Sequence, residues 1–223
     1  MKMCKIEIGK DLKELNNEIA AKNRNSFKLH DIFVLNIMGS PGAGKTTLLE
    51  NILPLLSEKY HIVVIEGDLA TENDAQRIRK TGVTALQINT NGGCHLDAHM
   101  IHHEFEKINA AETELIIIEN VGNLVCPISF DLGEDLRIVV LSTPEGEDKP
   151  LKYPPAMLKT DAVILTKTDL AGYVDVNTEI MKKHITDINP RVCVMESGKI
   201  NGVYSADKIV SYIKDKIEAK KVF

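Results

Sequence analysis

The chain contains no tryptophan, few other aromatic residues and no excess of positive charge. Of its 223 residues 4% are aromatic, and 32 acidic against 27 basic side chains give a formal net charge of −5. A basic surface is what attracts nucleic acid and anionic membranes, so neither is expected as a partner. No stretch approaches the ~18 consecutive apolar residues of a membrane-spanning helix, and the N-terminal segment lacks the apolar run of a signal peptide. We therefore expect a cytoplasmic protein.

The chain also has few cysteines, and they do not form a disulfide framework. Cys4, Cys94, Cys126 and Cys193 are far apart in the sequence. Because the cytosol keeps thiols reduced, metal ligation or packing is the expected role. Cys193 lies inside the apolar run RVCVME and is interpreted as a buried strand cysteine. Cys4 has no assigned role.

From Ile32 onward, apolar runs alternate with helical patterns. The apolar runs are IFVLNIM, HIVVIE, TALQI, ELIIIE, LRIVVL, DAVILT and RVCVME, and the helical patterns are Lys45–Ser57, Glu72–Lys80, Leu96–Ile108, Val176–Ile188 and Ala206–Ala219. This rhythm predicts an α/β fold of three layers, with a mainly parallel sheet of about seven strands flanked by helices. We expect one domain over residues 31–223. Residues 1–30 are expected to form a short amphipathic helix, Asp11–Arg24, and a polar connector, KNRNS.

The strongest motif follows the run IFVLNIM. It matches the phosphate-binding loop pattern G-x-x-x-x-G-K-[ST] between a strand and a helix, and its residues are Gly39, Ser40, Pro41, Gly42, Ala43, Gly44, Lys45, Thr46 and Thr47. Backbone N–H groups of such a loop face phosphates, Lys45 supplies a point charge, and the Thr46 hydroxyl is expected on Mg²⁺. The alternative is a glycine-rich turn that binds nothing. Strand, spacing and helix together favour a P-loop NTPase.

A second motif indicates which nucleotide binds. After the run DAVILT come Thr166, Lys167, Thr168 and Asp169, which resemble the guanine motif [NT]-K-x-D. The aspartate of such a motif can accept hydrogen bonds that guanine donates and adenine does not. Thr166 replaces the commoner asparagine, whose amide usually ties this motif to the base and the phosphate loop, so reduced affinity or selectivity for guanine is expected. Downstream, Ser197, Gly198 and Lys199 match the short motif that contacts the guanine oxygen. The alternative for Asp169 is a helix cap or a solvated loop acid.

Two acids end neighbouring apolar runs where a Mg²⁺ water shell would lie. Asp68 follows VVIEG, and Glu119 follows ELIII and opens the sequence Glu-Asn-Val-Gly. The latter resembles a [DE]-x-x-G switch, with Glu119 near the metal and the Gly122 N–H facing the γ-phosphate. The alternative for Asp68 is an acid that orders the turn after its strand. No side-chain base is identifiable, and phosphoryl transfer does not require one.

The segment after Asp68 has simpler interpretations. Thr71 and Asp74 fit a helix capping pattern. Arg77 and Arg79 are arginine-finger candidates, although a solvated helix face is favoured for both.

A cluster of cysteine and histidine follows the run TALQI. Cys94 and His95 are followed by His99 and His103 at intervals of four residues, which places the three histidines on one face of the expected helix. The alternative is a polar helix surface. Cys126 follows the switch on a loop expected at the same sheet edge. Thiolate and imidazole ligands suit Zn²⁺ or Ni²⁺, so Cys94, His95 and Cys126 are candidate ligands, with His99 as a marginal fourth. Three ligands leave a tetrahedral shell incomplete, which a site shared in a homodimer would fill.

Together these motifs resemble the HypB family, the hydrogenase nickel-incorporation GTPases of the SIMIBI class. The resemblance rests on GSPGAGKTTLLE, GDLATENDAQRI, GGCHLDAHM, IIIENVGNLVCP and TKTDL and extends from about Ile32 to the C-terminus. It implies a GTP-binding dimer that helps insert nickel into the large subunit of nickel–iron hydrogenase, with the nickel-binding protein HypA as partner. It also implies metal ligation by Cys94, His95 and Cys126. Some members carry an N-terminal C-x-x-C-G-C motif or a histidine-rich tract, whereas this chain has only Met1, Met3 and Cys4 there.

Three other functions are considered. The urease accessory GTPase is a close relative, but it has Cys-Pro-His after the switch where this chain has Cys126-Pro127-Ile128. A P-loop small-molecule kinase would need no guanine motif, and no arginine-rich lid is apparent. A metal-storing protein with a vestigial nucleotide site conflicts with the intact Lys45 and Thr46.

Overall fold

Seven parallel strands form the central sheet in the order β3-β2-β4-β1-β5-β6-β7. The computed structural model describes residues 2–68, 73–200 and 202–221, with side chains from residue 12 onward except that of Ile200. The strands are β1 (Phe33–Gly39), β2 (Ile62–Asp68), β3 (Thr84–Asn89), β4 (Leu115–Glu119), β5 (Leu136–Ser142), β6 (Ala162–Thr166) and β7 (Cys193–Ser197), with a small antiparallel pair, β8 (Lys199–Ile200) and β9 (Val203–Tyr204). The expected sheet of about seven strands is confirmed.

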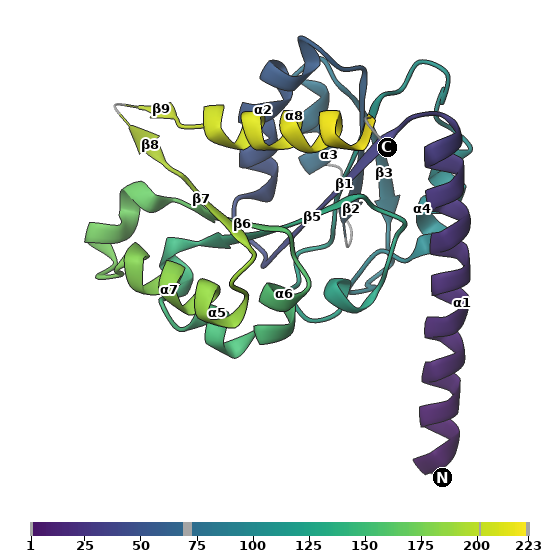
Figure 1. Ribbon diagram of the computed structural model, residues 1–223, viewed down its shortest axis with the longest axis horizontal. Helices are drawn as coiled ribbons and strands as arrows, with labels where there is room; N and C mark the ends of the chain where they lie inside the picture. The colour runs from purple at the N-terminus through teal and green to yellow at the C-terminus, as the bar shows by residue number, and fades with distance from the viewer. Residues whose placement is uncertain (1, 69–72, 201, 222–223) are drawn as a thin grey trace.

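Helices cover both faces of the sheet, which gives the three expected layers. The helices are α1 (Lys2–Leu29), α2 (Lys45–Ser57), α3 (Asn73–Arg79), α4 (Ala98–Phe105), α5 (Lys149–Lys152), α6 (Pro154–Leu158), α7 (Thr178–Ile188) and α8 (Asp207–Lys221), with the 3-10 turns η1 (Pro127–Ser129), η2 (Thr143–Glu145) and η3 (Thr168–Tyr173). In Figure 1, α2, α3 and α8 lie above the sheet and α5, α6 and α7 below it.

Each sheet face has its own apolar core. Leu35 and Ile37 of β1 pack with α2, α3 and α8 on one face. On the other face, Val34 packs with α1 and α4, and Met38 packs with α6 and α7. Neighbouring residues of one strand therefore serve opposite cores, which explains the unbroken apolar runs in the sequence.

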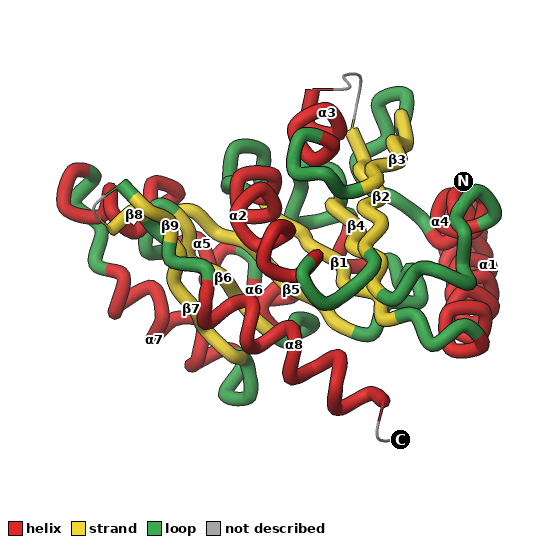
Figure 2. Tube along the Cα trace, turned by 90° about the horizontal axis from the view of Figure 1, so that it is seen from above, coloured by secondary structure: helices red, strands yellow, loops and turns green. Residues whose placement is uncertain are grey.

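The first helix is longer than the sequence suggested. α1 continues through KNRNS to Leu29, so the expected connector is wrong. The stretch contains no glycine or proline to end a helix, and burial holds it in place. Asn23 and Phe27 are almost fully buried, and the Phe27 ring meets Phe105 of α4 edge-on at 5.0 Å between centroids. Figures 1 and 2 show α1 beside α4, and Figure 1 shows the N-terminal end of α1 projecting beyond the sheet. A domain boundary near residue 30 stays a prediction.

Helix α4 begins later than expected, and this changes the position of one candidate ligand. Asp97 is the N-cap, because its side chain accepts a hydrogen bond of 2.8 Å from the Met100 N–H. His95 therefore lies in the loop before the helix and does not share a helix face with His99 and His103, contrary to the expectation. No helix among the described residues is long and apolar enough to cross a membrane.

Candidate nucleotide and metal sites

The phosphate loop joins β1 to α2 at the carboxyl edge of the sheet and borders a cavity of about 350 Å³. Gly42 and Gly44 adopt left-handed φ angles of 72° and 91°, which curl the loop around this space. The Lys45 side chain is buried, and its ammonium group donates to the Gly39 carbonyl at 3.4 Å. The Gly39 carbonyl is thus the hydrogen-bond acceptor for the Lys45 ammonium group, and a phosphate oxygen would replace it as the acceptor. Against the effect of burial, the Ser40 hydroxyl and the Ser142 N–H lower the pKa of the Glu145 carboxyl.

The guanine motif is tied directly to the phosphate loop. The Thr166 hydroxyl donates to the Ala43 carbonyl at 2.6 Å, and the Lys167 ammonium donates to the Gly42 carbonyl at 2.7 Å. Thr166 therefore contacts the phosphate loop through its hydroxyl although it lacks the amide of asparagine. The expected reduction in affinity or selectivity for guanine stays a prediction.

The other two parts of the base site also meet. Asp169 lies at the start of η3, and its carboxylate accepts from the Lys199 N–H at 3.1 Å. Beside them, Ser197 and Tyr204 line a cavity of about 70 Å³ together with Gly44, Thr47, Leu48, Thr166 and Lys167. Tyr204 was not predicted from the sequence, since it comes from the short β8–β9 pair, which carries no motif.

The acids in the cavity that the phosphate loop borders (the phosphate cavity) differ in part from those expected. The Thr46 hydroxyl donates to Glu119 at 2.8 Å, so the two groups lie close enough to bind one Mg²⁺. Glu119 is grouped with Glu66 and Asp74, whose carboxylate oxygens all lie within 4.8 Å of one another. Asp68 lines the same cavity but is not part of this group. Glu66 and Asp74 were not assigned to the ion site from the sequence. Glu66 could have been identified there as a charged residue inside the apolar run VVIEG.

Glu66 and Glu119 face each other because β2 and β4 pair in register at these positions. Both side chains are almost fully buried, and one oxygen of each lacks a hydrogen-bond partner. Burial and the charge of Glu119 raise the pKa of Glu66, and burial raises the pKa of Glu119 against the opposing effect of Lys45. Buried carboxylate oxygens with unused lone pairs are suitable ligands for a hard cation such as Mg²⁺.

Arg77 is not on a solvated helix face, so that interpretation is wrong for this residue. It lines the phosphate cavity, donates to the Thr47 hydroxyl at 2.9 Å, and pairs with Glu50 at 2.6 Å and Asp74 at 3.1 Å. Arg79 instead donates to the Ala85 carbonyl. Thr71, the partner suggested for Asp74 in a capping pattern, lies outside the described residues.

The switch sequence links the phosphate cavity to the loop after β3. A side chain at Gly122 would meet Pro41 at 3.0 Å, so this glycine allows the switch to approach the phosphate loop closely. The buried Asn120 side chain accepts from the Leu96 N–H at 3.2 Å. Asn123 donates to the Cys94 carbonyl at 3.3 Å. The two asparagines therefore connect the switch with the segment that contains Cys94 and His95.

Cys94, His95 and Cys126 come together as expected. One ligand atom from each lies within 4.8 Å of the others. The hydrogen bond between the thiols and then burial raise the pKa of Cys94, while burial lowers the pKa of His95 and keeps its ring neutral. Two thiols and an imidazole fit Zn²⁺ or Ni²⁺. His99 is exposed on α4 and is not part of this group.

The other cysteines lie apart from this group. Cys193 is half-buried in β7 against the core, in line with the packing role expected for it. The side chain of Cys4 lies outside the described residues. A further contact was not predicted: Phe130 stacks on the His95 ring at 3.8 Å between centroids.

Comparisons with known proteins agree on one family. Residues 33–196 match the model described as CobW/HypB/UreG, nucleotide-binding domain. The hydrogenase maturation factor HypB of Azotobacter chroococcum is 46% identical over 88% of this chain, which spans 65% of that relative's length. The probable HypB of Methanocaldococcus jannaschii is 38% identical over 97% of both chains. The crystal structure of HypB from Helicobacter pylori in complex with nickel superposes with a TM-score of 0.83 at 38% identity, covering 92% of this chain and 96% of that one.

Proposed function

The chain belongs to the HypB family of hydrogenase maturation factors, and from this premise we propose that it is a GTPase that controls the delivery of nickel to the large subunit of nickel–iron hydrogenase. The relative solved in complex with nickel supports this choice of metal. The observation that carries the proposal is the hydrogen bond between Asn120 and Leu96, which joins the phosphate switch to the metal-ligand loop.

GTP occupies the cavity at the edge of the sheet. Lys45 neutralises β and γ oxygens, and Thr46 and Glu119 would hold Mg²⁺ with Glu66 and Asp74 close by. When bound there, Mg²⁺ would supply positive charge beside the transferred phosphoryl group. Asp169 selects guanine, because guanine offers its carboxylate the N1–H and 2-amino donors that adenine lacks. The chain's own contribution is position and charge, so hydrolysis is slow without further help.

Cys94, His95 and Cys126 bind one Ni²⁺ or Zn²⁺ as cargo or as a regulatory ion. Three protein ligands leave a tetrahedral shell open, and a second copy of the chain completes it in a homodimer. HypA and the hydrogenase large-subunit precursor are the proposed partners in transfer. The cytoplasmic location expected from the sequence stays a prediction.

Nucleotide state reaches the metal through the switch. When the Gly122 N–H and Glu119 bind γ-phosphate and Mg²⁺, Asn120 and Asn123 carry the change to Leu96 and Cys94, and Cys126 moves with the same segment. Such coupling is reciprocal and is worth about 1–3 kcal/mol, so metal changes GTP affinity by the same factor.

Two other functions are less well supported. A urease-type accessory GTPase shares the family model, but the relatives above carry the HypB name. A P-loop kinase does not explain the contact between Asp169 and Lys199 or the metal ligands.

The test measures Ni²⁺ affinity and dimer dissociation of the purified chain with GDP and with a non-hydrolysable GTP analogue. We expect both constants to differ between the two nucleotide states. Identical values would refute the coupled mechanism, and release of phosphate from ATP as fast as from GTP would refute the assignment as a GTPase.

A further inference from the structure

Helix α1 joins the two loops that carry the metal ligands. The Asn16 side chain accepts a hydrogen bond of 2.9 Å from the Ala98 N–H and donates one of 2.8 Å to the Asp131 carbonyl. Two turns later, Asn23 donates to the Ala98 carbonyl at 2.8 Å and to the Leu132 carbonyl at 3.2 Å. One face of α1 thus makes the same bridge twice.

Both ends of this bridge are close to metal ligands. Ala98 is three residues after His95, and Asp131 is five residues after Cys126, with the short turn η1 between Cys126 and Asp131. The residue before Asp131 is Phe130, whose ring stacks on His95. Contacts of α1 with Ala98 and Asp131 therefore act on both sides of the metal site.

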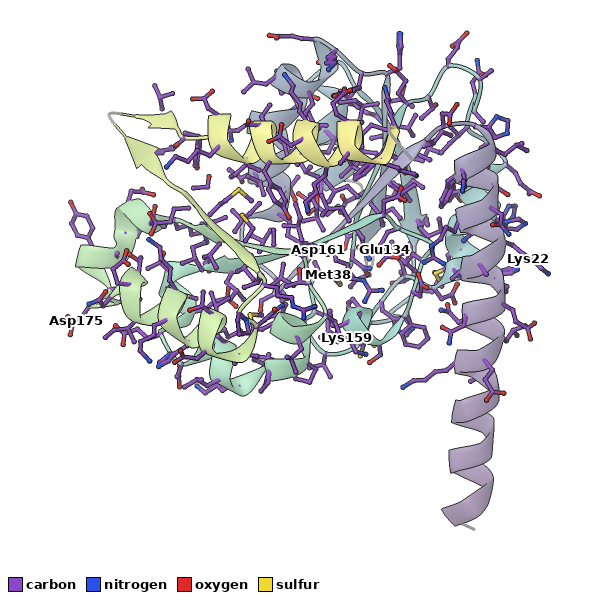
Figure 3. All side chains as sticks on the ribbon, in the orientation of Figure 1. Lys22, Met38, Glu134, Lys159, Asp161 and Asp175 are labelled. Atoms are coloured by element: carbon purple, nitrogen blue, oxygen red, sulfur yellow. The ribbon has the colours of Figure 1, made fainter. Side chains whose placement is uncertain are left out.

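The bridge is built from buried amides and not from general apolar packing. Asn16 and Asn23 are 6% and 1% exposed, whereas the neighbouring Asn17 and Lys22 are exposed. Figure 3 shows Lys22 on the outer side of α1, pointing away from the sheet. Apolar side chains would hold the helix on α4 but would not fix the backbone of two loops at defined distances, as hydrogen bonds to specific N–H and C=O groups do.

We propose that Asn16 is a positioning residue for the metal site: by holding the Ala98 N–H and the Asp131 carbonyl together, it sets the separation of Cys94 and His95 from Cys126. This inference rests on the metal binding proposed above and adds α1 to the site. Groups outside the ligand shell that fix ligand orientation typically change metal affinity by about 10- to 100-fold when removed. Asn16 does not line the phosphate cavity. We therefore expect the affinity of the protein for GDP to be independent of Asn16.

The test compares Asn16→Ala with Asn17→Ala, a control one position away on the exposed side of the same helix. Ni²⁺ and Zn²⁺ affinities are measured by competition with a chromophoric chelator, and GDP affinity is measured on the same samples. We expect Asn16→Ala to weaken metal binding about tenfold, to alter the thiolate-to-nickel absorption of the loaded protein, and to leave GDP affinity unchanged. Asn17→Ala should match the wild type.

Asn16→Asp is the second variant, for use also if the alanine variant does not fold. It keeps the acceptor for the Ala98 N–H and loses the donor to the Asp131 carbonyl, so we expect weaker metal binding with GDP affinity retained. Wild-type metal affinity and an unchanged nickel spectrum in the folded variant would overturn the inference, as would an equal loss of metal and GDP affinity. A wild-type chain that binds neither metal would overturn the proposed metal function as well.

Discussion

The Thr46 hydroxyl and the Glu119 carboxylate are joined by a hydrogen bond of 2.8 Å between the end of the phosphate loop and the end of β4. Mg²⁺ bound by both groups would replace this bond. Glu119→Gln keeps the shape but removes the charge, so we expect the Mg²⁺ concentration needed for half-maximal GTP hydrolysis to rise about 10- to 100-fold. Glu112→Gln, at an exposed position, is the control. An unchanged Mg²⁺ requirement in Glu119→Gln would exclude Glu119 from the ion site.

Lys45 is the main positive charge inside the phosphate cavity, and its ammonium group rests on the Gly39 carbonyl. Lys45→Ala should lower the rate of GTP hydrolysis by at least about 100-fold, because charge that develops on the phosphate would lose its nearest cation. Phosphate release measured at saturating GTP checks this, with the exposed Lys59→Ala as control. Hydrolysis at the wild-type rate would mean that nucleotide binds elsewhere.

Asp169 is the residue expected to discriminate between bases. Asp169→Ala should remove most of the preference for GTP over ATP, which in sites of this kind reaches about 10⁴-fold. Competition binding with a fluorescent GDP analogue measures both affinities, and Asp175→Ala, exposed after the same turn, should keep the preference. A wild-type chain that binds ATP and GTP equally would contradict the guanine assignment directly.

Cys126 is the proposed metal ligand that is far in sequence from the other two. Cys126→Ala leaves one thiol and one imidazole, so we expect Ni²⁺ affinity to fall by at least about 100-fold and stoichiometry to drop at micromolar metal. Cys193→Ala, a cysteine of the core in β7, should bind metal like the wild type. Equal losses in the two variants would point to general damage by cysteine removal and not to ligation.

Metal binding should strengthen as pH rises. The Cys94 pKa is raised above its ordinary value, so this thiol is protonated at neutral pH and its proton must leave when metal binds. Each thiol proton that metal binding displaces makes affinity grow about tenfold per pH unit below the thiol pKa, and the proposed site contains two thiols. The lowered pKa of His95 keeps the ring neutral, so it adds no pH dependence near neutrality. Chelator competition at about pH 6.5, 7.5 and 8.5 gives the slope; a flat profile would argue against thiolate ligation.

The sequence was sufficient to predict those parts of the site that consist of residues adjacent along the chain. The phosphate loop, the switch and the guanine motif each lie where one strand ends, and the carboxyl ends of parallel strands meet at one sheet edge, so their proximity followed from the predicted fold. The same reasoning correctly brought Cys126 to Cys94 and His95.

Contacts set by register and by long-range packing could not be read from patterns. Glu66 faces Glu119 only because β2 and β4 pair at these two positions. Asn16 is separated by more than eighty residues along the chain from each of its two partners, Ala98 and Asp131. The helical state of KNRNS depends on burial of Asn23 and Phe27 against α4, which overrides its polar composition.

The strand order divides the nucleotide site into two halves with β1 between them. The loops after β6 and β7, which are proposed to bind the base, lie on one side, while the switch after β4 and the Cys94 loop after β3 lie on the other. In the proposed mechanism the metal ligands would therefore respond to the number of bound phosphates, and they do not contact Asp169, the residue proposed to identify the base. A triphosphate of a purine with altered ring substituents would change the occupancy of the nucleotide site. Each bound triphosphate would nevertheless have the same effect on metal affinity.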